Sequence, residues 1–199
     1  MSPTELAKCR RVLAAVLAVA ASAGLARDAH AHPHVWATVR SEIILDANRQ
    51  ITGVRHAWTF DEMYSAMAVQ GPDANGDGVY SPEELKPPEN ASLDYDKSLL
   101  TLHFTLPLAT PLNAHSQEVQ VDVYDPSFFV AFGFATEAPV TLSGPAVKGC
   151  TAEVKKPDSD TEEDAKALSE SFFSQLGPNS NFGSQFAQTV TVKCSDAPS

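Results

Sequence analysis

Cationic side chains are scarce in this chain of 199 residues: 14 Lys and Arg stand against 25 Asp and Glu, which gives a formal charge of −11. Nucleic-acid binding needs clustered cations that displace counterions from phosphates, and docking on anionic lipid needs a basic patch. The charge balance therefore predicts that the protein binds neither. No apolar run after residue 31 approaches the length of a membrane-spanning helix, so we expect no membrane insertion.

The chain also lacks the short motifs of the common hydrolases and nucleotide-binding enzymes. It contains no Gly-x-Ser-x-Gly, no His-Glu-x-x-His and no phosphate-binding glycine loop. We therefore expect a binding protein and not an enzyme.

Residues 1–31 have the pattern of a cleaved export signal. A basic start at Lys8, Arg10 and Arg11 precedes the apolar residues 12–25, and Ala29 and Ala31 supply the small residues of a cleavage site. We expect a periplasmic mature protein of residues 32–199. Removal of the signal takes away four cationic and two acidic side chains, so the formal charge moves from −11 to −13.

Two cysteines, Cys150 and Cys194, remain after this cleavage. In an oxidising compartment such a pair usually forms a disulfide. Each lies at the edge of a strand-like stretch, so the bond would join the last strand to an earlier one. Closing a loop of this length stabilises the fold by about 4 kcal/mol in the chain-entropy model. Two free thiolates that hold a metal are the alternative.

Alternation of apolar and polar residues dominates the mature chain. Residues 35–43 and 54–60 alternate on either side of a turn at 46–50, which predicts a hairpin. If Val39 and Ile43 share a face with Trp58 and Val54, paired residue numbers sum to about 95–97, and His34 lies opposite Asp61 or Met63.

Further strands are predicted at 99–106, 117–124, 128–135, 140–142, 150–155 and 189–194, with prolines such as Pro107 and Pro111 in the breaks between them. Residues 161–176 are predicted as a helix with Thr161 as its N-cap. The expected fold class is mainly β (α+β): one antiparallel β-sandwich domain over 32–199, with an EF-hand-like insertion at about 61–90 and one helix in the C-terminal region.

Residues 73–84 match the calcium loop of an EF-hand at every specified position. Gly78 would make the sharp turn, and 61–70 could be the entering helix. The expected calcium ligands are Asp73, Asn75, Asp77, the carbonyl of Val79, Ser81 and the bidentate Glu84. A surface turn without calcium is the alternative. The loop is single and its exit helix is cut short by Pro87, so a structural site is expected.

Cleavage after Ala31 would expose His32 as the first residue. Its α-amine and imidazole can chelate one metal ion, and His34 could complete a nitrogen-rich site for nickel, zinc or copper. Pro33 has no N–H, which excludes the motif that binds copper through deprotonated amides. Asp61 is a possible oxygen ligand and His103 a spare one. The alternative is an ordinary first strand whose imidazoles face water.

Several blocks of the sequence resemble the bacterial domain-of-unknown-function family 1007. They are the start HPHVW, WTFDEMYSA (58–66), the DANGDG calcium loop with SPEEL, FTLPLATPL (104–112) and YDPSFFVAF (124–132). The resemblance implies a periplasmic component of an ABC-type transport system, or an accessory of a nickel/cobalt-type permease of the inner membrane.

Three functions are compatible with these observations. The first is a periplasmic metal-binding accessory protein of a transition-metal uptake or efflux system, with structural calcium. The second is a calcium-stabilised β interaction module without a transition metal. The third is a histidine-brace copper enzyme, which needs a third nitrogen ligand that His103 alone could supply.

Overall fold

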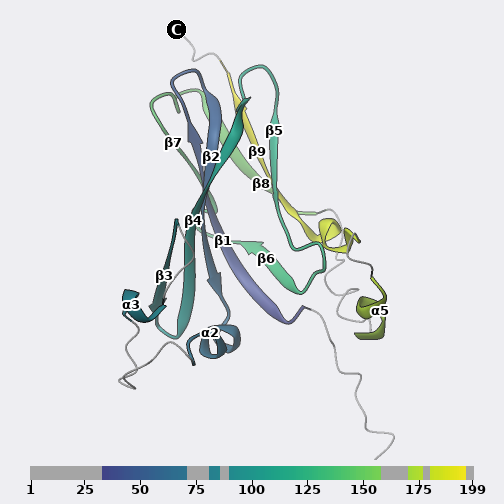
Figure 1. Ribbon diagram of the computed structural model, residues 1–199. Helices are drawn as coiled ribbons and strands as arrows, with labels where there is room; N and C mark the ends of the chain where they lie inside the picture. The colour runs from purple at the N-terminus through teal and green to yellow at the C-terminus, as the bar shows by residue number, and fades with distance from the viewer. Residues whose placement is uncertain (1–32, 71–80, 86–89, 158–169, 177–179, 196–199) are drawn as a thin grey trace, which may run out of the picture. The chain divides into compact units, whose positions relative to one another are not determined.

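The computed structural model of the protein describes residues 33–70, 81–85, 90–157, 170–176 and 180–195. All of them belong to one compact unit, Ala31–Ser199. Their strands form two sheets (Figure 1). None of the helices in these ranges is long and apolar enough to cross a membrane.

The larger sheet has six strands in the order β3-β4-β2-β1-β6, and β7 also pairs with β1. These strands are β1 (Val35–Leu45), β2 (Gln50–Phe60), β3 (Ala91–Asp96), β4 (Leu99–Asn113), β6 (Val130–Phe134) and β7 (Val140–Ser143). The smaller sheet has the order β5-β9-β8, formed by β5 (Val119–Val123), β8 (Cys150–Lys155) and β9 (Gln188–Cys194). The described helices are α2 (Glu62–Ala68), α3 (Pro82–Leu85), α5 (Glu170–Gln175) and the 3-10 helix η1 (Phe182–Phe186).

The predicted hairpin is confirmed by β1 and β2. Val39 pairs with Trp58 and Ile43 with Val54, so paired residue numbers sum to 97, within the predicted range. Odd-numbered residues of β1 are buried, and even-numbered residues are exposed or half-buried, as the two-residue period of a strand requires. The register therefore fixes which side chains of β1 face the core and which remain accessible.

The prediction that all strands pair antiparallel is wrong. β6 and β7 run parallel to β1, with Val35 beside Val130 and Ser41 beside Val140. Alternation within one strand shows which residues are buried, but it does not show the direction of the neighbouring strand. The chain passes through β5 of the smaller sheet before it returns as β6, so no tight hairpin forces β6 to run antiparallel to β1.

β3 is a strand that the sequence analysis does not predict. Ala91, Leu93 and Tyr95 are half-buried and alternate with exposed residues, which is a regular strand pattern. Two of the exposed residues are Asp94 and Asp96, and aspartate is unfavourable in strands. The alternation outweighs this preference because the acidic side chains all face solvent.

Pro107 and Pro111 lie within β4 and not in breaks between strands, so that prediction is also wrong. β3 pairs with β4 only as far as Phe104, and the rest of β4 pairs with β2 alone. An edge strand tolerates proline, because its missing N–H can fall on the side without a neighbour.

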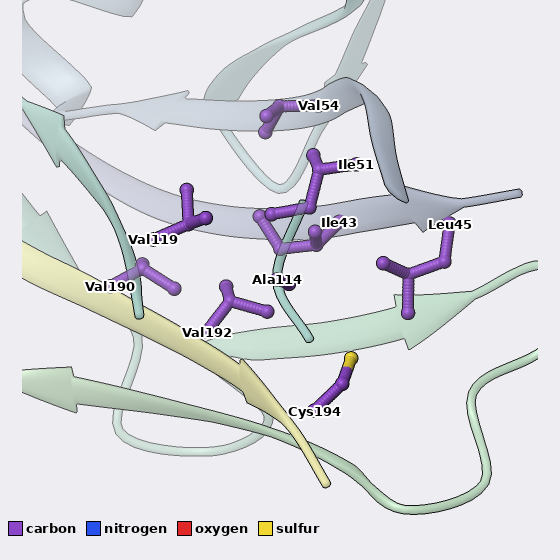
Figure 2. Close-up of a cluster of buried hydrophobic side chains, with 9 residues drawn as sticks. All are labelled: Ile43, Leu45, Ile51, Val54, Ala114, Val119, Val190, Val192 and Cys194. Atoms are coloured by element: carbon purple, nitrogen blue, oxygen red, sulfur yellow. The ribbon is translucent and has the colours of Figure 1, made fainter. Parts of the chain in front are cut away.

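The two sheets pack face to face through one cluster of buried aliphatic side chains (Figure 2). Ile43 and Ile51 come from the larger sheet and Val190 and Val192 from β9, and all four are fully buried. Burying each such side chain stabilises the fold by about 1.5–3 kcal/mol. The fold is mainly β, and its two sheets share one core, as the sheets of a β-sandwich do.

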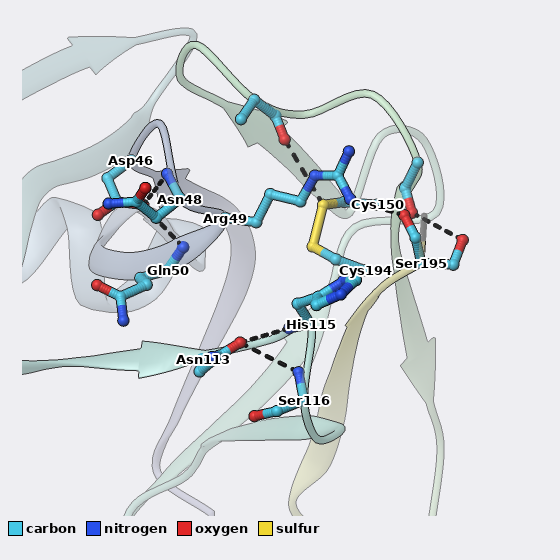
Figure 3. The surroundings of a disulfide bond; sticks show 12 residues. Asp46, Asn48, Arg49, Gln50, Asn113, His115, Ser116, Cys150, Cys194 and Ser195 are labelled. Carbon is cyan, nitrogen blue, oxygen red and sulfur yellow. Dashed lines mark hydrogen bonds between the residues drawn. A yellow bond between two sulfur atoms is a disulfide. The ribbon is translucent and has the colours of Figure 1, made fainter. Parts of the chain in front are cut away.

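A disulfide joins two strands of the smaller sheet (Figure 3). Cys150 of β8 stands directly opposite Cys194 of β9, and their sulfurs are bonded. The predicted link between the last strand and an earlier one is therefore confirmed. Beside it, Arg49 donates a hydrogen bond of 2.9 Å from Nη1 to the carbonyl of Ser195, which ties the β1–β2 turn to the end of β9.

Of the predicted helix at 161–176, only the last part lies in the described residues, where α5 covers Glu170–Gln175. Its proposed N-cap, Thr161, lies outside them. Phe173 of α5 is buried with Phe128 and Phe186 in a second apolar cluster, so this helix has a core of its own.

Candidate metal-binding end of strand β1

His34 lies immediately before β1, and its side chain is exposed. The backbone N–H groups of His34 and Val35 donate hydrogen bonds of 2.9 and 3.2 Å to one acceptor, the carbonyl of Phe129. The ring of His34 also lies 4.8 Å from the ring of Phe129, measured between centroids. The structure therefore fixes the backbone at His34 and leaves its imidazole at the surface.

The loop that holds Phe129 is tightly constructed. The Asp125 carboxylate accepts hydrogen bonds from the N–H groups of Ser127 and Val130, both at 2.9 Å. Phe128 is buried at a φ of 58°, a conformation that is strained for a bulky residue. Gly183 packs so closely that a Cβ there would lie 1.7 Å from the Asp125 carbonyl oxygen. Backbone strain of this kind persists only where the surroundings impose it, as they do here.

Asp61 connects the start of β1 to helix α2. Its Oδ1 accepts a hydrogen bond of 2.9 Å from the N–H of Tyr64 and so caps α2, while its Oδ2 accepts one of 2.9 Å from the N–H of Trp36. The Asp61 N–H in turn donates to the Trp36 carbonyl. These bonds place Asp61 opposite Trp36, two residues along the chain from His34. Asp61 lies between the end of β2 at Phe60 and the start of α2 at Glu62. Each oxygen keeps a lone pair for a cation.

His103 does not lie near His34. It pairs across the sheet with Ala57, which pairs with Arg40, and Arg40 is six residues along β1 from His34, or about 20 Å. The Nε2 atom of His103 lies 2.8 Å from Oδ2 of Asp94. The structure therefore does not bring His103 into a site with His34.

His56 is a core histidine, as expected from its place among apolar residues. It is 4% exposed, its Nδ1 lies 2.9 Å from the hydroxyl oxygen of Ser41, and burial lowers its pKa. It is an uncharged structural residue at neutral pH and not a ligand.

Most of the predicted calcium ligands lie outside the described residues, namely Asp73, Asn75, Asp77 and Val79. Ser81 and Glu84 are described and form a capping box at the start of α3. The N–H and the hydroxyl of Ser81 both donate to Oε2 of Glu84 at 3.0 Å, and the Glu84 N–H donates to the Ser81 hydroxyl at 3.3 Å.

The two ends of the predicted calcium loop converge. Val69, which follows α2, and Leu85 of α3 are buried in the same cluster, together with Leu100 of β4. Helices therefore flank the loop on both sides, and their apolar residues share one core. Residues 73–80 of the predicted calcium loop lie outside the described residues.

Within the described ranges no three His, Cys, Asp or Glu side chains are grouped closely enough to hold a metal ion. His32, on which the predicted chelate depends, lies outside those ranges. Of the residues predicted to bind a transition metal, the described part of the chain includes His34, Asp61 and His103.

Four apolar side chains on β1, α2 and the Phe129 loop are exposed, and the sequence analysis assigned them no role. They are Trp36 at 45%, Phe129 at 46%, Met63 at 63% and Met67 at 61% exposure. Met63 and Met67 stand one helical turn apart, and the buried Ser65 and Val69 lie on the opposite side of that turn. The sequence held one sign of this exposed pair. Met63 and Met67 are the sole methionines after Met1, and their spacing of four residues places them on one face of a helix.

Comparison of the sequence with known proteins identifies a family. The family model described as "Protein of unknown function (DUF1007)" matches residues 17–88 and 84–194. The chain belongs to this family. It is also 25% identical over 195 residues to an uncharacterized protein of Haemophilus influenzae, a match that covers 82% of this chain and 91% of the relative. No solved structure matches. The family assignment confirms the resemblance seen in the sequence, and it carries no function with it.

Proposed function

We propose that the protein is a periplasmic metal-binding accessory protein without catalytic activity, which serves a transition-metal transporter of the inner membrane. Calcium would stabilise the 73–84 loop, and a transition metal would bind at the start of β1. The Cys150–Cys194 disulfide agrees with an oxidising compartment, and the acidic charge favours cations over anions at long range.

The observation that carries this proposal is the way in which the chain start is held. Two backbone hydrogen bonds to Phe129 fix His34 while its imidazole stays exposed, and the Asp61 carboxylate is held beside Trp36. An ordinary first strand needs neither a strained loop to support it nor a carboxylate that binds its second residue. The proposed ligands are the α-amine and imidazole of His32, the imidazole of His34 and the carboxylate of Asp61.

The donor types restrict the metal. Amine and imidazole nitrogens with one carboxylate suit nickel, zinc and copper(II). The thioethers of Met63 and Met67, on the helix that Asp61 caps, would add soft donors suited to copper(I). A comparison of these ions therefore also tests whether α2 takes part.

Isothermal titration with nickel, zinc and copper tests the amino-terminal site. The protein that begins at His32 should bind one ion per chain, and a version with one extra residue before His32 should bind about tenfold more weakly or worse, because its α-amine is displaced. His34→Ala should weaken binding as well, whereas His115→Ala serves as the matched control. Equal binding by all four proteins would place the metal elsewhere.

A calcium titration of the melting temperature tests the loop separately. Calcium at about 100 times its Kd should stabilise the protein by about 2.7 kcal/mol. Glu84→Gln should abolish this gain without loss of the α3 cap, because glutamine at this position can also close a capping box. An unchanged melting temperature at millimolar calcium would remove the calcium site.

The exposed Trp36, Phe129, Met63 and Met67 favour a second function, an interaction module whose fold is stabilised by calcium alone. This module would respond to the calcium titration and would show no stoichiometric binding of nickel, zinc or copper. The two titrations together therefore separate the two functions.

A further inference from the structure

A pocket of about 300 Å³ opens over β1, β2 and β4 of the larger sheet. These three strands are neighbours in that sheet (Figure 1). Its lining includes the side chains of Arg40, Glu42, Arg55, Ala57, His103 and Thr141. Neither His34 nor the calcium segment contributes to it, so it is separate from the proposed metal site.

The strand register explains why there is space here. Arg40, Ala57 and His103 form one row across three neighbouring strands. Arg40 and His103 are therefore about 10 Å apart at their backbones, two strand spacings. Ala57, which lies between them, has only a methyl side chain. It therefore leaves space between the longer side chains of Arg40 and His103.

In the next row, Arg55 pairs with Glu42 across the strands, and their side chains form a hydrogen-bonded ion pair of 2.6 Å. A hydrogen bond from Ser143, together with the charge and hydrogen bond of Arg55, keeps the pKa of Glu42 low against the opposing effect of its burial. Glu42 is therefore ionised at neutral pH and offsets the charge of Arg55.

Arg40 is different, because it makes no ion pair within the described part of the chain. The chain has three arginines after residue 31, and two of them line this pocket although the protein is strongly acidic. Acidic side chains are abundant, yet Glu42 alone among the lining residues is acidic. The pocket thus combines the guanidinium of Arg40, which has no ion-pair partner among the described residues, with the imidazole of His103, whose Nε2 lies 2.8 Å from the Asp94 carboxylate.

We propose that this pocket binds a small oxyanion, a carboxylate or a phosphate. A guanidinium can donate two parallel hydrogen bonds to either group. Ala57 adds only a methyl group to the lining, and Thr141 adds a side chain with a hydroxyl. The guanidinium of Arg40 disfavours a free metal cation here, and the acidic charge of the whole protein disfavours an extended polyanion.

Isothermal titration of the exported protein with inorganic phosphate and with succinate, in metal-free buffer at constant ionic strength, tests the proposal. One of the two should bind with a Kd in the millimolar range or tighter. Arg40→Gln should weaken this binding about tenfold or more by removing the free guanidinium, and Ala57→Leu should do so by filling the space at this position without a change of charge. Lys97→Gln, which removes an equal charge from an exposed turn, should leave it unchanged.

Binding of phosphate alone would assign the pocket to phosphate compounds, and binding of succinate alone to carboxylates. Equal Kd values in all four proteins, or no heat with either anion up to about 20 mM, would overturn the proposal. Far-ultraviolet circular dichroism checks that each variant is folded. If Ala57→Leu does not fold, the comparison of Arg40→Gln with Lys97→Gln still decides the test.

Discussion

The two ends of β1 are held in different ways. Ile43 and Leu45, near its end, are fully buried against the smaller sheet, close to the Cys150–Cys194 disulfide. His34, at its start, is exposed and held by hydrogen bonds to Phe129. An apolar core excludes unpaired polar groups, whereas an end held by hydrogen bonds can present an imidazole to solvent. The comparison places stability at one end of the strand and the proposed binding chemistry at the other.

The disulfide should give the largest effect on stability. Replacing both cysteines, Cys150→Ser with Cys194→Ser, should lower the free energy of unfolding by about 4 kcal/mol, because the unfolded chain regains the entropy of an open loop. Urea denaturation measures this loss. Nickel, zinc and copper affinity should stay the same at temperatures where the variant is folded; weaker metal binding by folded protein would mean that the two ends are not independent.

Gly183→Ala should differ from loss of the disulfide in its effect on metal affinity. Its Cβ would meet the Asp125 carbonyl at 1.7 Å, so the loop that carries Phe129 must move, at a cost of about 3 kcal/mol. Metal affinity should fall together with stability, because Phe129 no longer fixes His34.

Gly133→Ala is the matched control for this change. Gly133 lies on β6, and a Cβ there meets nothing within 4 Å, so both stability and metal affinity should be retained. Equal effects of the two alanine substitutions would contradict the role assigned to the Phe129 loop.

Asp61→Ala should have a smaller effect, a loss of about 1–2 kcal/mol in urea denaturation, because it removes the cap of α2 and the bond to the Trp36 N–H. Asp61→Ser should recover the part that comes from the cap. Asp122→Ala, an exposed carboxylate on β5, should cause no loss. If Asp61→Ala lowers stability but leaves metal binding intact, Asp61 is a structural link and not a ligand.

Replacing His56 with glutamine should change the pH dependence of the free energy of unfolding. The effect should be the smallest of these at neutral pH and clear in acid. The pKa of His56 is lowered in the folded state, so the unfolded chain takes up the proton first as the pH falls. Its contribution is therefore complete above the unfolded pKa of about 6.5 and is lost below it, by at most about 1.4 kcal/mol per pH unit. Urea denaturation between pH 7.5 and 5.5 should show a steeper loss for the native protein than for His56→Gln; parallel curves would contradict a buried neutral imidazole.

Local alternation was enough to predict the hairpin, the parity of its register and most of the strands. Val39, Ile43, Val54 and Trp58 have a side-chain period that admits one pairing parity. The same signal could not show that β6 and β7 lie parallel to β1, because the direction of a neighbour depends on connections and not on burial.

The candidate site was predictable only in part. Cys150 and Cys194 followed from their number and compartment, and Asp61 followed from the register to within two residues. The support that Phe129 gives to His34 arises from a strained loop far along the chain, and such contacts leave no local pattern. The separation of His103 from His34 likewise depends on strand order, which one sequence does not specify.

Native mass spectrometry of the protein recovered from its own cells tests the central claim most directly. The account predicts a chain of residues 32–199 with its disulfide formed, which carries one transition-metal ion that is lost when His34 is replaced by alanine. A chain that starts at another residue, or the same metal content in the His34→Ala protein, would contradict the proposed site at the start of β1.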